Sequence, residues 1–314
     1  FKYRKGGTNI MRAFIFDKYG YYEDDEYGVE FDYLGWHFKL EKVDKNENEL
    51  KELNEFVKKL EAIFYDSGVA IIKNRDNKYM SVADFGNCAL VSVKQRLMKL
   101  DDLFKMHAYF KNEEKNASYT IKEMQKLWED KIDLLEEKIL PAIKADDYSY
   151  EKMMTIIIYA LGVAENALQY LAETILDYGE EIENLTLCHK RFSDYSSYEF
   201  FSPFNLIVDS PMRDLAELYK SNLINNERLI EVLNMYSATQ KDVSILLARI
   251  LYPTPILDLL DDYYIMHKDV KHDIFKYQDN VKEYIKRVSE LEKAFVYKYK
   301  ICLLYTSDAA DDKA

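Results

Sequence analysis

The residues best suited to chemistry lie between His189 and Asp209. The carboxylates of Asp194 and Asp209 could each accept a proton or bind a divalent cation. Arg191 can do neither, because a guanidinium group has five donors, no acceptor and a pKa above about 12. It would also repel a cation. Of these three residues, only Asp194 and Asp209 could therefore serve in acid–base or cation chemistry.

Both aspartates also have a structural interpretation. Asp194 lies in the segment 192–197, which is rich in residues that bond their own backbone in turns. Asp209 precedes Ser210 and Pro211, an arrangement typical of an N-cap before a helix with proline at its first position. A turn is the favoured interpretation of Asp194, whereas a cation ligand and an N-cap remain equal alternatives for Asp209.

The same stretch resembles the catalytic loop of aminoglycoside-phosphotransferase-like kinases, which reads His-Gly-Asp, then Asn, and then a strand that ends in Ile-Asp-Phe-Asp. The separation of His189 from Asp209 is similar to the one in that family. This register places Arg191 at the catalytic Asp, Ser196 at the Asn and Pro211 at the second metal-binding Asp. The resemblance implies a kinase frame without catalysis, because losing a general base alone costs roughly 10²–10⁴ in rate.

A working kinase also needs a glycine-rich loop and a strand lysine paired with a helix glutamate. The chain contains no GxGxxG motif. Lys42, or less favourably Lys39, precedes an expected helix that offers Glu52 and Glu55 as partners. The favoured interpretation of each of these four residues is a solvent-facing charge. ATP and Mg²⁺ are the cofactors that the resemblance implies, and the sequence makes neither certain.

Both ends of the chain are expected to be non-native. Lys5-Gly6-Gly7 can be encoded by a ribosome-binding sequence, and Met11 follows at the usual short spacing, so residues 1–10 are interpreted as upstream translation. Residues 302–314 include Tyr305–Asp312, which resembles translated sequencing adapter. The domains expected are a kinase-like N-lobe over 11–94 and a helical C-lobe over 95–301.

Charge and composition limit the partners. The formal charge is −13, and it becomes −14 without the suspect ends, which argues against a nucleic-acid partner. Cys88, Cys188 and Cys302 have no paired spacing, so neither a disulfide framework nor a zinc site is indicated. No run reaches the roughly 18 apolar residues of a membrane span. We expect synthesis in the cytoplasm and no membrane span.

The first hundred residues predict strands around one helix. Aromatic and polar residues alternate as in half-buried strands, and a helical stripe recurs over Glu49–Tyr65. The expected strands are Met11–Tyr22, Tyr27–Val43, a hairpin of Val69–Lys73 with Tyr79–Ala83, and Cys88–Val93.

From Gln95 onward the chain is predicted to be mainly helical. Thr120 and Glu123 fit a capping box that opens a helix through Lys138, disturbed near Pro141. Tyr150–Asp177 is expected to be a buried central helix. The fold class expected is α+β, namely a two-lobed protein-kinase-like fold with a small β-rich N-lobe and a large helical C-lobe.

Three further segments resemble YutH-like spore coat proteins, relatives of the CotS-type coat kinases. They are Tyr159–Leu171, Arg213–Glu217 and Ala248–Thr254, and the match extends over most of Met11–Tyr299. This resemblance implies a kinase-like fold, a place in the spore coat and other coat proteins as partners. The sequence sets no oligomeric state.

Three functional hypotheses follow. The leading one is a kinase-fold pseudoenzyme that serves as a binding or structural protein of the spore coat. The second is an active ATP-dependent phosphotransferase, acting on a small molecule or a protein, that uses Asp194 and Asp209. The third is a scaffold that binds no nucleotide.

Overall fold

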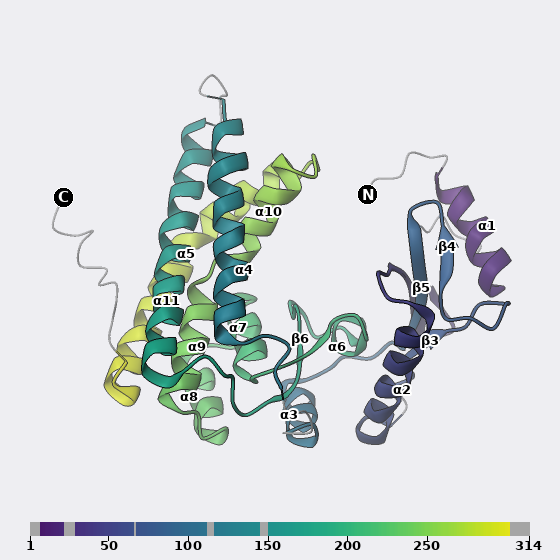
Figure 1. Ribbon diagram of the computed structural model, residues 1–314, viewed down its shortest axis with the longest axis horizontal. Coiled ribbons are helices and arrows are strands. Elements are labelled where there is room, and N and C mark those ends of the chain that lie inside the picture. Colours follow the sequence, from purple (N-terminus) through teal and green to yellow (C-terminus); the bar gives the residue numbers. More distant parts are fainter. Residues whose placement is uncertain (1–6, 22–28, 66, 112–115, 145–149, 302–314) are drawn as a thin grey trace. The chain divides into compact units, whose positions relative to one another are not determined.

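The computed structural model describes residues 7–21, 29–65, 67–111, 116–144 and 150–301, with side chains from residue 13 onward. The chain forms two compact units (Figure 1). The first unit contains residues 1–111 and 187–207, and the second contains 112–186 and 208–314. Residues 95–111 and the segment 187–207, which the sequence had assigned to the C-lobe, therefore belong to the first unit. The proposed non-native ends fall largely outside the described residues.

The first unit is built on an antiparallel sheet with the strand order β1-β2-β5-β3, and β4 pairs with β5. The strands are β1 (Glu30–Tyr33), β2 (Trp36–Lys42), β3 (Ala70–Ile72), β4 (Ser81–Ala83) and β5 (Gly86–Lys94). Leu34 and Gly35 join β1 to β2 with φ values of 50° and 82°. Positive φ at both positions is the geometry of a two-residue hairpin turn. The strands expected in Tyr27–Val43 and at Cys88–Val93 are confirmed.

The strand expected over Met11–Tyr22 is wrong, because this segment forms the helix α1 (Gly7–Tyr19). Ile15 is buried and Tyr19 packs against the same core, a spacing of four residues that fits a helix face. Gly20 ends the helix with φ +82°, and its N–H donates to the carbonyl of Phe16 at 2.9 Å. The alternation of aromatic residues in this segment does not indicate a strand. Gly20 was the better signal, because a glycine with positive φ is typical of a helix end.

The hairpin expected between Val69–Lys73 and Tyr79–Ala83 is also wrong. β3 and β4 both pair with β5 and not with each other. The buried Asn74 organises the connection, because its side chain accepts from the N–H groups of Asp76 and Lys78 and donates to the Met80 carbonyl, all at 3.0 Å. These bonds replace the ladder that a hairpin would have needed.

One helix of the first unit, α2 (Glu47–Ile63), forms as expected. Asn46 caps it, and Glu49 completes a capping box. Its inward side chains Leu50 and Val57 are fully buried, and Leu50 packs in a cluster with Ile71 of β3. The first unit continues through α3 (Leu100–Tyr109).

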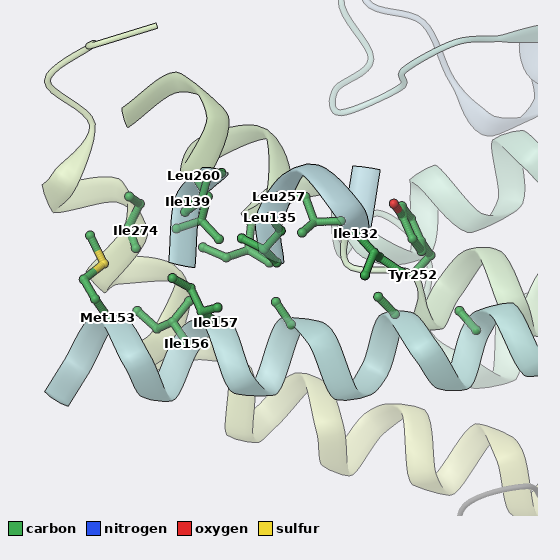
Figure 2. Close-up of a cluster of buried hydrophobic side chains, with 14 residues drawn as sticks. Ile132, Leu135, Ile139, Met153, Ile156, Ile157, Tyr252, Leu257, Leu260 and Ile274 are labelled. Atoms are coloured by element: carbon green, nitrogen blue, oxygen red, sulfur yellow. The ribbon is translucent and has the colours of Figure 1, made fainter. Parts of the chain in front are cut away.

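The second unit is helical and contains the larger core. Its helices are α4 (Ile121–Leu134), α5 (Tyr150–Tyr178), α7 (Met212–Lys220), α8 (Asn226–Met235), α9 (Gln240–Leu251), α10 (Thr254–Tyr264) and α11 (Lys271–Tyr299). The Thr120–Glu123 capping box is confirmed, and α4 continues into a π-helical turn and then a 3₁₀ turn at Pro141. Figure 2 shows Ile156 and Ile157 of α5 beneath Leu135 and the helices α4 and α10. Burying each such side chain contributes about 1.5–3 kcal/mol.

Two stretches are long and apolar enough to cross a membrane by length and composition alone. They are α5 and the segment Gln240–Tyr264. The second is 72% buried, and core helices of soluble proteins pass the same test. This is weak evidence, so the expected absence of a membrane span stays a prediction.

Candidate functional site

The candidate catalytic loop lies between two short paired strands, β6 (Thr186–His189) and β7 (Leu206–Asp209). We call residues 189–201 the 189–201 loop; it includes the short helix α6 (Ser197–Phe201). The N–H of Lys190 donates to the carbonyl of Asn205 at 2.7 Å and extends the strand pairing. The far side of the loop attaches to the chain after β5, where the N–H of Met98 donates to the Tyr195 carbonyl at 3.0 Å.

His189 is a structural residue of this loop. Its side chain is fully buried, and Nε2 lies 3.0 Å from the carbonyl oxygen of Phe200. The imidazole ring also stacks on Phe192, with centroids 4.6 Å apart. These contacts hold the first residue of the loop against the last helix of the loop.

Arg191, which the sequence register places at the catalytic aspartate, has an exposed side chain and a backbone held by hydrogen bonds. Its N–H donates to Oδ1 of Asn205 at 3.1 Å, and Nδ2 of Asn205 donates to the Arg191 carbonyl at 2.8 Å. The same Nδ2 also donates to the carbonyl of Glu199 at 2.9 Å. The amide side chain of Asn205 therefore closes the loop at Arg191. An amide is not a base, so Asn205 does not replace the missing aspartate.

Asp194 and Ser196 serve the loop backbone. Oδ1 of Asp194 accepts from the N–H of Ser196 at 2.7 Å, which is an Asx turn. Ser196 caps α6, and its Oγ accepts from the N–H of Glu199 at 3.3 Å. The Glu199 carboxylate in turn accepts from the N–H groups of Ser193 and Asp194 at 2.7 and 3.2 Å. This geometry favours the turn interpretation of Asp194 over the role of a substitute base.

Asp209 forms a buried ionic centre in the second unit. The residue is 2% exposed, and its Oδ2 accepts from Arg249 at 2.7 Å and from Arg213 at 3.0 Å. Its Oδ1 accepts from the N–H of Ser210 at 2.7 Å. We call Asp209, Arg213 and Arg249 the Asp209 centre. Both carboxylate oxygens are engaged by donors of the chain.

The N-cap role considered for Asp209 is wrong. The helix α7 begins at Met212, with Pro211 at the N-cap position and not at the first helical position. The hydroxyl of Ser210 accepts from the N–H of Met212 at 3.3 Å, so Ser210 bonds the helix start. Asp209 is turned toward the arginines instead.

The Asp209 centre does not fit a magnesium ion. Its one carboxylate (−1) lies between two guanidinium groups (+2), so the three side chains carry a formal charge of +1. Magnesium is bound through carboxylates and phosphates in near-ideal octahedral geometry. A divalent cation at Asp209 would have to displace two charge-assisted hydrogen bonds and approach two positive groups. Pro211, at the second metal position, has no side-chain ligand.

The lysine and glutamates suggested for nucleotide binding are exposed. Lys42 lies at the end of β2, and Glu52 and Glu55 lie on the solvent side of α2. Glu55 accepts from Lys58 at 2.7 Å, a pairing within its own helix. A pair between Lys42 and either glutamate stays a prediction.

Lys39 is the more enclosed lysine of β2. Its Nζ lies 3.2 Å from Glu30 and 3.3 Å from Glu41, and 5.0 Å from the ring centroid of Tyr198 in α6. Burial lowers the pKa of Lys39, but Glu41 and Glu30 outweigh it and raise the pKa above its usual value. The hydroxyl of Tyr198 donates to Glu41 at 2.6 Å, and burial together with that carboxylate raises the pKa of the phenol. The ammonium group of Lys39 therefore forms its ion pairs with two glutamates of the first unit.

Sequence reasoning missed the residues that hold both regions in place. Asn205 closes the loop, and Arg249 pairs with Asp209 from 40 positions away. Arg213 follows Asp209 by four residues, and both arginines belong to the segments that resembled coat proteins. Those segments were the available signal, although neither indicated an ion pair.

The fold belongs to the kinase-like class. A crystal structure of an aminoglycoside phosphotransferase from Alicyclobacillus acidocaldarius aligns with a TM-score of 0.59 over 85% of this chain and 92% of the other, at 8% sequence identity. Such low identity establishes the fold alone. The small sheet and helical majority agree with it, so the predicted fold class is confirmed.

Within that class, the chain belongs to the family described as "Spore coat putative kinase YutH", whose model matches residues 13–297. It is also 26% identical over 178 residues to the endospore coat-associated protein YutH of Bacillus subtilis. That alignment covers 51% of each protein, so the chain matches about half the length of this relative. The resemblance noted from Tyr159–Leu171 and its companion segments is confirmed.

Proposed function

We propose that this chain is a kinase-fold protein of the spore coat that acts by binding other coat components and does not transfer phosphate. The coat association follows from the family and from the name of its Bacillus subtilis relative. The observation that supports loss of catalysis is the Asp209 centre, where the one acidic residue kept from the metal motif is paired with two arginines.

The loop supports the same conclusion. Arg191 stands where a base is required, and a guanidinium cannot accept a proton at physiological pH. Asp194, the substitute base of the alternative hypothesis, is bonded to Ser196 and contributes to a turn. Phosphoryl transfer depends on positioning and charge neutralisation by such groups. In the part of the chain that the structure describes, neither region presents such an arrangement, which supports the proposal.

A phosphotransfer assay tests the proposal. The protein would be incubated with γ-labelled ATP, Mg²⁺ and isolated coat proteins, beside an aminoglycoside phosphotransferase with its own substrate as the working control. We expect phosphate release and transfer at the level of the buffer blank for the wild type and for Asp194→Asn. Turnover that is lost in Asp194→Asn would overturn the proposal in favour of an active kinase.

Nucleotide binding is a separate question with its own measurement. A ligand at 100 times its dissociation constant stabilises a fold by about 2.7 kcal/mol. A shift of the thermal midpoint with millimolar ATP would identify a nucleotide-binding pseudoenzyme, and its absence would identify a scaffold. Because Lys39 is paired with Glu30 and Glu41, we expect no shift.

A further inference from the structure

A small pocket lies in the helical unit, among residues to which the kinase comparison gives no role. Its walls come from α5, from the end of α9 with the turn that follows it, and from α11. Both α5 and α11 pack against α9 (Figure 1). The cavity has a volume of about 210 Å³.

Aromatic and proline rings form most of the wall. Tyr277, Val281 and Tyr284 line it from α11, at the spacing of four and then three residues that keeps side chains on one helix face. The hydroxyl of Tyr284 donates to the carbonyl of Ile250 at 2.8 Å and joins α11 to the end of α9. Pro253 continues the wall.

The segment Ala248–Thr254, which resembled coat proteins, therefore contributes both to the Asp209 centre and to the pocket wall. Arg249 bonds Asp209, and the next four residues line the pocket. Because Arg249 is buried in the Asp209 centre, the end of α9 is held at a fixed position and the turn after it is held with it. The pocket wall is thus built from rigid elements, as a binding site requires.

The polar side chains of the wall are four tyrosine hydroxyls, the Asn280 amide and the Lys220 ammonium group. Burial raises the pKa of Tyr159 to about 12 and raises that of Tyr277, so both phenols stay protonated at neutral pH. Lys220 lies 3.7 Å from Glu217 and donates to Oγ1 of Thr254 at 3.3 Å, so its charge is balanced by a neighbour. No carboxylate side chain is among the described residues that line the pocket.

The volume limits the size of a ligand. A dry cavity of about 150 Å³ can hold benzene, whereas pockets for drug-sized molecules begin at about 300 Å³. A cavity of about 210 Å³ fits between these limits and has room for one substituted six-membered ring. Ring walls favour a planar, apolar occupant.

We propose that this pocket binds a small uncharged ring compound that carries one hydrogen-bond acceptor, such as an aromatic amide. The ring packs among Tyr277, Tyr284 and Pro253, and the acceptor receives the hydroxyl protons of Tyr159 or Tyr277. A carboxylate binds less well, because neutral phenols do not compensate the loss of its hydration. The site is independent of phosphate transfer, so its test is unaffected by the outcome of the kinase assay.

The test is a titration of the full chain with benzamide, in which saturation-transfer NMR measures binding. Benzoate and benzylamine serve as charged ring probes of the same size. We expect benzamide to bind with a dissociation constant of roughly 1 mM, the affinity typical of a ligand of this size, and the charged probes to bind at least several-fold more weakly. No saturable binding of benzamide at 10 times that concentration, about 10 mM, would overturn the proposal, as would tighter binding of benzoate or benzylamine.

Variants on α11 locate the site. Val281→Trp should fill the pocket and remove binding, and Tyr277→Phe should weaken it by about 2- to 10-fold through loss of one hydrogen bond. Tyr297→Phe on the same helix, where Tyr297 is 84% exposed, is the matched control and should bind as the wild type does. Thermal unfolding checks that each variant is folded. Unchanged binding in both folded pocket variants would place the probe elsewhere and overturn the assignment.

Discussion

The 189–201 loop and the Asp209 centre are stabilised by different kinds of interaction. In the loop, the neutral amide of Asn205 makes three hydrogen bonds to backbone groups around Arg191. At the Asp209 centre, a carboxylate that is 2% exposed pairs with two guanidinium groups. Under the proposed function, the loop has lost its chemistry through substitution of residues. The centre kept its acid, which now contributes to structure.

The difference between the loop and the Asp209 centre affects how a substituted residue and a retained residue of the kinase motif should be interpreted. The absence of a base at position 191 is evident from the residue type alone, because a guanidinium group cannot accept a proton. A retained aspartate at 209 is not evidence of a metal site, because its partners decide what its charge does. The two regions should therefore differ strongly in their response to the same substitution.

The largest expected effect comes from that matched pair. Asp209→Asn removes the negative charge that pairs with both guanidinium groups, so the free energy of unfolding should fall by about 3–5 kcal/mol. Asp194→Asn keeps the oxygen that accepts from the N–H of Ser196, so the free energy of unfolding should change by less than about 0.5 kcal/mol. Urea unfolding of both variants measures the difference. Equal losses would contradict the distinction between the regions.

An intermediate effect is expected for Asn205→Ala in the loop. The substitution removes the side chain that closes the loop, and a loss of about 1–3 kcal/mol follows from unsatisfied backbone groups. Hydrogen exchange should also accelerate at the amide of Arg191, which loses its acceptor.

The control for that variant is Asn48→Ala on the exposed side of α2, expected within about 0.5 kcal/mol of the wild type. If the backbone amide of Arg191 exchanges at the same rate with and without the Asn205 side chain, that side chain does not hold the loop.

The last expected effect is a pH dependence, and it concerns a partly buried acid whose pKa only burial perturbs. Burial raises the pKa of Glu292 on α11 from 4.5 to about 7. The folded protein then holds this proton more tightly than the unfolded chain does, so the free energy of unfolding should decrease as pH rises from about 4.5 to above 7. Glu292→Gln should flatten this dependence.

Urea unfolding at several pH values across this range measures the slope. The exposed neighbour Glu290→Gln is the control and should keep the wild-type slope. A wild-type protein whose stability rises over the range would contradict a raised pKa of Glu292.

Much of the fold was predictable where the deciding interactions are local. The capping box of Thr120 and Glu123 lies within one turn of helix, and it marks the start of α4. The turn around Asp194 depends on residues two to five positions away. Short-range hydrogen bonds of this kind are visible in the order of the residues.

The errors occurred where distant partners decide. β3 and β4 both use β5, so the pairing depends on competition for one strand and not on the turn between them. In α1, packing against the sheet core selected a helix in a segment with strand-like alternation. Propensity is a weak signal when tertiary packing opposes it.

The sequence by itself determined that no base stands at position 191, because proton affinity is a property of the arginine side chain. It also indicated the coat-protein family through segments such as Tyr159–Leu171. Only the tertiary structure decided the partners of Asp209, because Arg249 reaches it from another helix. The charge of a buried acid is set by its neighbours in space, and chain order does not reveal them.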